Sequence, residues 1–222
     1  MYSKLADFYD KYIGFYYQLY EDIIKEIINK DDSCLDLACG SGTLVKILNK
    51  YTNDVIGSDL SSEMLSKAKE KNPYNDFFIH DLKEDFYIGD LKLITCTIDS
   101  INYLLKTSEV VNLFNNVNNN LQIGGYFLFD IYTTSKLSAM ENYSYHEVYE
   151  GYTFIWDSYV EDDFINSYLT FYILENNLIT RYDEVHIQRV YKKDFIDSLL
   201  KNYQIKKFYA EDRIIYLCKK EA

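Results

Sequence analysis

The sequence contains few residues that would interrupt or cross-link the chain. Pro73 is its one proline, and its four cysteines (Cys34, Cys39, Cys96 and Cys218) include no C-x-x-C pair. Zinc sites and disulfide frameworks use cysteines at short, regular spacings, so we expect neither, and no metal ion. No apolar run approaches the roughly 18 residues of a membrane helix, so no membrane span is expected.

Positive charge is also scarce. The 23 Lys and Arg residues face 35 Asp and Glu residues, a net charge of -12. Such a surface repels phosphate backbones, so nucleic acid is a poor match unless a local basic patch overrides the balance. The opening MYSKLADFYD lacks the charged-then-apolar pattern of a secretory signal. We expect a cytoplasmic protein, as a monomer or a homodimer.

Strand-like and helix-like segments alternate over the first 130 residues. Short apolar runs at 34–38, 55–58, 77–79, 93–98 and 126–131 are typical of strands covered on both faces. Helical patterns lie between them, and a further helix is predicted over residues 12–29. Gly124-Gly125 is expected to end the helix before the last of these strands. Repeated strand–helix units predict an α/β fold with a doubly wound parallel sheet.

The pattern changes after about residue 140. Residues 143–191 alternate with period two and contain turn-like Glu161-Asp162-Asp163 and Glu175-Asn176-Asn177, which predicts three or four antiparallel strands. A helix at 192–203 and strands at 205–210 and 214–218 follow. We therefore divide the chain into a core of 1–142 and 192–222 and a β insertion of 143–191.

A glycine-rich turn, Leu35 to Thr43 (LDLACGSGT), follows the first strand and opens a helix. Gly40 and Gly42 allow a tight turn and close approach to a ligand. The third glycine of a dinucleotide fingerprint is replaced by Val45, and there is no phosphate-binding loop. Asp36 would repel a pyrophosphate but suits an ammonium group.

Two later strands also end in acids. Asp59 closes VIGSD and Asp81 follows FIH. Because ligands bind at the carboxyl ends of parallel strands, these acids and Asp36 are expected at one site, with Asp59 on ribose hydroxyls. Asp59 alone could instead be a helix cap, and Asp81 alone a solvated loop residue.

LDLACGSGT, VIGSDLSSEML and HDL, in this order, resemble the class I S-adenosylmethionine-dependent methyltransferases. The resemblance implies a seven-stranded, mostly parallel sheet and S-adenosyl-L-methionine as cofactor, with S-adenosyl-L-homocysteine as product. It implies cofactor contacts from the turn (Asp36, Ala38, Cys39, Gly40, Gly42), the ribose acid Asp59, the adenine neighbours (Leu60, Met64, Asp81, Leu82), and Thr97 to Asp99 beneath the sulfonium.

The opening segment and the insertion resemble the sugar and small-amine N-methyltransferases of that class. This implies that Tyr9 and Tyr17 reach the cofactor carboxylate and that the insertion covers the substrate, although both tyrosines could simply be core residues. The fourth strand ends in IDSINY rather than the D/N-P-P-F/Y loop of enzymes that methylate base or glutamine amides.

An amine acceptor must be neutral to attack, so a nearby acid or imidazole can take its proton. The candidates are Asp99, Tyr103 and His186 as catalytic residues, and Asp99, Tyr132 and Arg189 as substrate contacts. The face carrying His186 could equally be solvated, and Arg189 could form a surface ion pair.

The sequence thus predicts a methyltransferase acting on a small-molecule amine or hydroxyl. The alternatives are an RNA- or tRNA-modifying methyltransferase, a non-catalytic relative that binds the cofactor, and, less favoured, a nicotinamide dehydrogenase.

Overall fold

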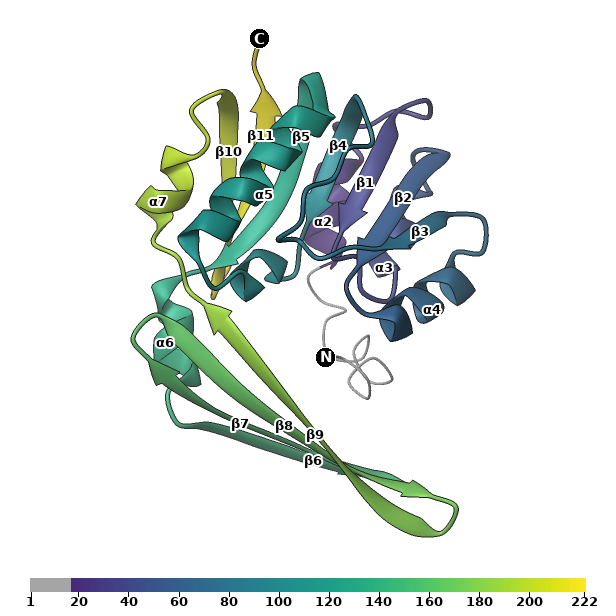
Figure 1. Cartoon of the computed structure of the whole chain (residues 1–222), viewed down its shortest axis with the longest axis vertical. Helices are drawn as coiled ribbons and strands as arrows, with labels where there is room; N and C mark the ends of the chain where they lie inside the picture. Colours follow the sequence, from purple (N-terminus) through teal and green to yellow (C-terminus); the bar gives the residue numbers. More distant parts are fainter. Residues whose placement is uncertain (1–16) are drawn as a thin grey trace.

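The computed structural model describes residues 17–222, and its core is a seven-stranded sheet between two layers of helices (Figure 1). The strand order is β10-β11-β5-β4-β1-β2-β3. The five parallel strands are β1 (Ser33–Leu37), β2 (Asp54–Asp59), β3 (Asp76–Ile79), β4 (Leu91–Cys96) and β5 (Leu121–Tyr132). Strand β11 (Arg213–Lys220) is antiparallel to both β5 and β10 (Tyr203–Tyr209). The predicted doubly wound sheet is confirmed.

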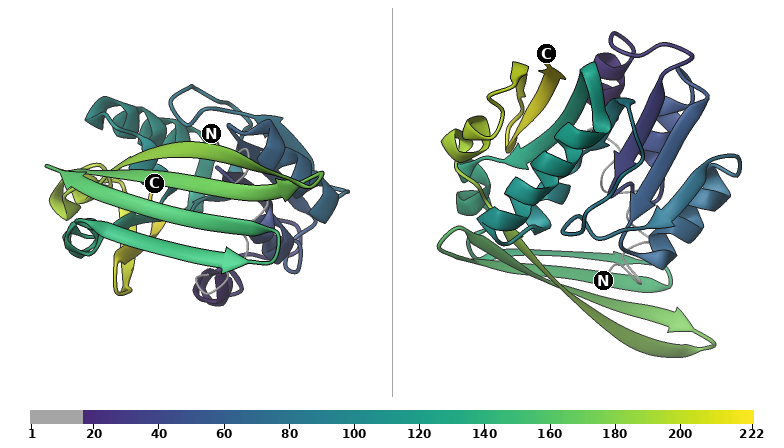
Figure 2. Two further views of the ribbon diagram at one scale, coloured as in Figure 1. Left: turned by 90° about the horizontal axis from the view of Figure 1, so that it is seen from below. Right: turned by 45° about the horizontal axis from the view of Figure 1, so that its top comes forward.

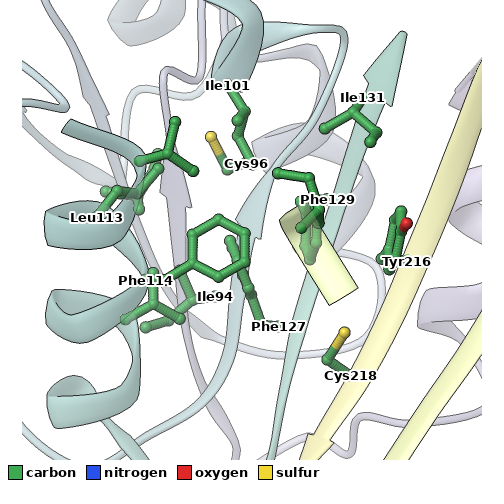
Figure 3. Packing of buried hydrophobic residues seen from close by; sticks show 14 of the residues in the cluster. Ile94, Cys96, Ile101, Leu113, Phe114, Phe127, Phe129, Ile131, Tyr216 and Cys218 are labelled. Atoms are coloured by element: carbon green, nitrogen blue, oxygen red, sulfur yellow. The ribbon is translucent and has the colours of Figure 1, made fainter. Parts of the chain in front are cut away.

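Alternate residues of one strand pack on opposite faces of this sheet. Phe127 and Phe129 of β5 pack with α5 (Thr107–Asn120) and α7 (Lys193–Ser198), while Leu128 packs with α2 (Tyr17–Ile24), α3 (Thr43–Leu48) and α4 (Ser62–Lys71). Figure 3 shows the first cluster, in which Phe114 meets Phe127 and Phe129 edge-on. Burial on both faces explains why the strands appear in the sequence as continuous apolar runs.

A separate four-stranded antiparallel sheet lies beneath the core (Figures 1 and 2). Its strands are β6 (Tyr143–Tyr149), β7 (Tyr152–Glu161), β8 (Phe164–Glu175) and β9 (Leu178–Arg189). It is joined to β5 through α6 (Thr134–Met140), and Tyr132 and Met140 pack against its Ile165. The second sheet therefore faces the carboxyl ends of the core strands.

Some element boundaries differ from those expected. Helix α5 ends at Asn120 and β5 begins at Leu121, so Gly124 lies inside the strand, at a φ of 76° beside a register shift against β4, and does not end the helix. The last helix stops at Ser198, short of the predicted 203. Helix α6 was not expected, because seven residues with one buried side chain carry little periodic signal.

The four cysteines are all buried and free in the described chain. Over residues 17–222, no helix is both long and apolar enough to cross a membrane.

Candidate active site

The site lies where the chain changes direction across the sheet. From the central β1, the chain builds β2 and β3 on one side and β4 and β5 on the other, which opens a crevice at the carboxyl ends of the strands. A cavity of about 550 Å³ occupies it. Seven predicted site residues lie on its wall: Ala38, Gly40, Asp59, Leu60, Asp81, Leu82 and Tyr103.

The other wall residues were not singled out individually from the sequence, although Ile98 lies within the predicted segment from Thr97 to Asp99. Some flank predicted positions, and the rest come from the segment after β4 and from β9. They are Ser61, Ser62, Glu63, His80, Lys83, Ile98, Ser100, Leu104, Leu105, Val185 and Ile187. The residues beside Asp59 and Asp81 could have been predicted from the motifs that contain these acids. Val185 and Ile187 could not, because their position depends on how the insertion packs against the core.

The turn after β1 is built from left-handed residues. Ala38, Gly40 and Gly42 have φ values of 52°, 53° and 75°, and the Gly42 N–H donates to the Cys39 carbonyl at 2.9 Å. A Cβ at position 42 would lie 2.7 Å from Asn72 Nδ2 and 2.9 Å from Ala68 Cβ. Glycine is thus required at position 42 by the close approach of α4 as well as by its backbone conformation.

Asp59 joins this turn to the start of α4. Its Oδ2 accepts from the Gly40 N–H at 2.8 Å and its Oδ1 from the Ser61 N–H at 2.9 Å. Burial raises the pKa of Asp59, and these backbone N–H groups oppose the rise. A carboxylate has about four lone-pair directions, so both oxygens keep acceptor capacity at the cavity wall. Asp59 therefore fits a pair of donating hydroxyls, such as those of a ribose.

Asp36 lies behind the cavity wall. Its Oδ1 accepts from the Thr95 hydroxyl at 2.6 Å, and its Oδ2 is a buried oxygen with no hydrogen-bond partner in the described part of the chain. Burial raises the pKa of Asp36 to about 7, opposed by the Thr95 hydrogen bond. A buried acceptor without a donor fits an ammonium group or a bridging water.

Tyr103, His186 and Glu184 form a chain of polar contacts beside the cavity. Tyr103, in the 3-10 turn η1 (Ser100–Tyr103), places its hydroxyl 3.2 Å from His186 Nδ1. His186 Nε2 lies 3.3 Å from Glu184 Oε2. Both β9 side chains are buried, so a solvated face is ruled out for His186. With Glu184 ionised, its carboxylate holds the proton on Nε2 and leaves Nδ1 to accept from Tyr103.

Asp99 is held in an ion-pair network. Its Oδ2 accepts from Gln188 Nε2 at 2.6 Å, and its Oδ1 lies 3.4 Å from the Arg213 guanidinium. Arg213 also contacts Asp130 at 3.0 Å, and the Tyr132 ring lies 5.4 Å from the guanidinium carbon. Burial raises the pKa of Asp99, and Arg213 opposes the rise. The structure thus brings Asp99 and Tyr132 together around Arg213, and neither is among the wall residues of the described chain.

The remaining predicted residues of the described chain do not line the cavity. Arg189 donates to the Leu105 carbonyl at 3.0 Å and packs against the rings of Phe164 and Tyr191, which anchors β9 to the segment after η1. Tyr17, Cys39, Met64 and Thr97 are buried, and none lies among the wall residues of the described chain. Tyr9 lies outside the described residues.

Comparison with known proteins defines the class. Residues 34–125 match the family described as Methyltransferase domain. A relative provisionally named a methyltransferase in Geobacillus sp. (strain WCH70) is 31% identical over 168 residues, 72% of this chain and 68% of that protein. An S-adenosylmethionine-dependent methyltransferase from Clostridium acetobutylicum is 29% identical with a TM-score of 0.86, covering 100% of this chain and 99% of that one.

Two further matches are to sugar-modifying enzymes. The sugar N-methyltransferase KedS8 from Streptoalloteichus sp. shares the fold at 17% identity with a TM-score of 0.82, over 93% of this chain and 87% of that one. A dTDP-3-amino-3,4,6-trideoxy-alpha-D-glucopyranose N,N-dimethyltransferase from Streptomyces venezuelae is 30% identical over 90 residues, 40% of this chain and 38% of that protein.

The chain belongs to the class I S-adenosylmethionine-dependent methyltransferases. Its cofactor is S-adenosylmethionine and its activity is methyl transfer. The hydrogen-bond acceptors of the site agree with that cofactor. Asp59 offers acceptors at the cavity wall, and Asp36 offers a buried acceptor beneath the glycine turn.

Proposed function

We propose that the protein transfers the methyl group to the nitrogen of a small-molecule amine. The contacts among Tyr103, His186 and Glu184 carry this proposal, because an amine that is methylated must lose a proton. Its relatives named as sugar N-methyltransferases and N,N-dimethyltransferases support the same acceptor class.

The chain's own residues would handle the proton. The acceptor nitrogen gives its proton to the Tyr103 oxygen, and the Tyr103 hydroxyl passes its own proton to His186 Nδ1. The imidazolium so formed carries protons on both nitrogens and is stabilised by Glu184 through Nε2. S-adenosylmethionine, when bound, supplies an electrophilic methyl group on a sulfonium.

The cofactor would be held by the predicted set. Asp59 would take the ribose hydroxyls. Asp81 would take the adenine amino group, with Leu60, Met64 and Leu82 beside the ring. The turn from Ala38 to Gly42 would cradle the methionine part, with Asp36 near its ammonium. The insertion 143–191 would cover the substrate, and Asp99, Tyr132 and Arg189 would shape its site indirectly by holding η1 and β9 in place.

Measuring S-adenosylhomocysteine release across matched pairs of small amines and their hydroxyl analogues tests this proposal. Free amino sugars and their deamino alcohols form suitable pairs. Turnover of amines with no turnover of the matched alcohols is expected. Turnover restricted to alcohols, or to transfer RNA added as a competitor substrate, would contradict it.

Variants of the contact chain then test the proton route with the amine so identified. Tyr103→Phe and His186→Gln are each expected to lower kcat by about 100-fold, the low end of what a positioned acid–base group contributes. The affinity for S-adenosylhomocysteine should stay unchanged. His146→Gln is the matched control, because His146 is exposed on the β6 strand of the same sheet. An unchanged kcat in both Tyr103→Phe and His186→Gln would rule out this proton route.

A further inference from the structure

Helix α4 contacts the glycine-rich turn through its last residues. Lys71 Nζ donates to Ser41 Oγ at 3.0 Å and to Thr43 Oγ1 at 2.7 Å. Asn72 Nδ2 donates to the Gly42 carbonyl at 2.9 Å and to the Ala68 carbonyl at 3.1 Å. Neither Lys71 nor Asn72 lies on the wall of the described cavity, so both act on the turn from behind.

The other end of α4 is tied to the same turn. Ser61 caps the helix by accepting from the Met64 N–H, and its own N–H donates to Asp59. Asp59 in turn accepts from the Gly40 N–H. The strand–helix unit from Asp59 to Asn72 therefore holds the turn at both ends, once through Gly40 and once through residues 41 to 43.

The turn needs such support because its backbone is unfavourable. Its left-handed residues include Ala38, whose Cβ makes that conformation costly by about 1–2 kcal/mol. Gly42 has Asn72 and Ala68 packed so close that no Cβ fits there. The contacts from Asp59 and α4 to residues 40 to 43, which follow Ala38, hold the turn in this shape before any ligand arrives, which preorganises it.

We propose that Lys71 and Asn72 are positioning residues for the cofactor, which set its affinity without touching it. Removing either one leaves the turn free to relax in the unliganded protein. Binding must then restore its shape, so affinity falls. This loss of affinity can be measured without knowing the methyl acceptor, because S-adenosylhomocysteine binds in the absence of the acceptor.

Calorimetric titration of S-adenosylhomocysteine into Lys71→Met and Asn72→Ala variants tests this. Each is expected to bind about tenfold more weakly than the wild type, the scale of one lost hydrogen-bonding group. Lys71→Arg, which keeps a positive charge and N–H donors, should stay within about twofold of the wild type. Lys69→Met is the matched control, because Lys69 on the same helix donates to the Asn75 carbonyl and not to the turn.

Hydrogen exchange of the unliganded protein gives the second readout. Amides of residues 40 to 43 should exchange faster in both variants than in the wild type and in Lys69→Met. A positioning role is excluded if both folded variants bind S-adenosylhomocysteine within twofold of the wild type. It is also excluded if Lys69→Met loses as much affinity as Lys71→Met, because the loss would then follow helix stability.

Discussion

Among individual residues, Asp36 and Asp59 show that two acids in one site can be held in different ways. Asp59 has a backbone N–H on each oxygen, whereas Asp36 has one hydroxyl donor and one buried oxygen with no partner among residues 17–222. The sequence predicted both as cofactor residues from their places at strand ends. It could not predict that only Asp59 reaches the cavity wall, because that depends on the left-handed turn at Ala38.

The raised pKa of Asp36 predicts a pH-dependent stability. Its folded pKa of about 7 lies above the ordinary 3.8. Between these values the folded state binds more protons than the unfolded state, so the contribution of Asp36 to the free energy of unfolding falls as pH rises. In Asp36→Asn the stability should fall less steeply with pH, because this contribution is removed while those of Asp59 and Asp99 remain. Urea unfolding of both proteins at about pH 4.5 and about pH 7.5 measures it; equal pH slopes would contradict the assignment.

At the scale of elements, helix α5 holds the segment that follows Asp81 and Leu82 of the cavity wall. Asn120 is fully buried; its Oδ1 accepts from the Ile88 N–H at 2.7 Å and its Nδ2 donates to the Phe86 carbonyl at 3.0 Å. The helical pattern between the apolar runs at 93–98 and 126–131 predicted α5. The contacts of Asn120 with Phe86 and Ile88 were not predicted, because the position of an asparagine in a helix does not show which loop its side chain will contact.

Replacing Asn120 by alanine should destabilise the fold. The partly buried backbone groups of Phe86 and Ile88 would lose their partner, which costs about 1–3 kcal/mol in the free energy of unfolding. Asn119→Ala is the control, since Asn119 is exposed on the same helix and alanine is a better helix former. Urea denaturation compares the two, and a similar loss in both would show that the loop contacts contribute little.

Across the whole molecule, one buried network joins the core to the insertion. Tyr20 of α2 and Arg213 of β11 both contact Asp130 of β5, and Arg213 and Gln188 of β9 both contact Asp99. Gln188 lies two residues after His186 on β9 and is buried, as His186 is. The network itself was beyond sequence reasoning, because its members are distant in the chain and meet only when both sheets form.

Arg213→Met should destabilise the protein by about 3–5 kcal/mol, because Asp130 becomes a buried charge without its cation. Arg213 and Asp130 have side-chain exposures of 3% and 0%. The double variant Arg213→Met/Asp130→Leu should recover part of the loss, since it removes both charges. Chemical denaturation of the three proteins gives the comparison, and a double variant less stable than Arg213→Met would argue against a charge effect.

The central claim, a methyltransferase cofactor site organised around Asp59, is tested most directly by calorimetric titration of S-adenosylmethionine, S-adenosylhomocysteine and NAD. We predict binding of the two sulfur nucleosides and no binding of NAD. Asp59→Ala should weaken that binding by about 100-fold or more, while Asp54→Ala, at the exposed opposite end of β2, should bind as the wild type does. Failure of the folded wild type to bind either sulfur nucleoside, or equal binding by Asp59→Ala, would contradict the account.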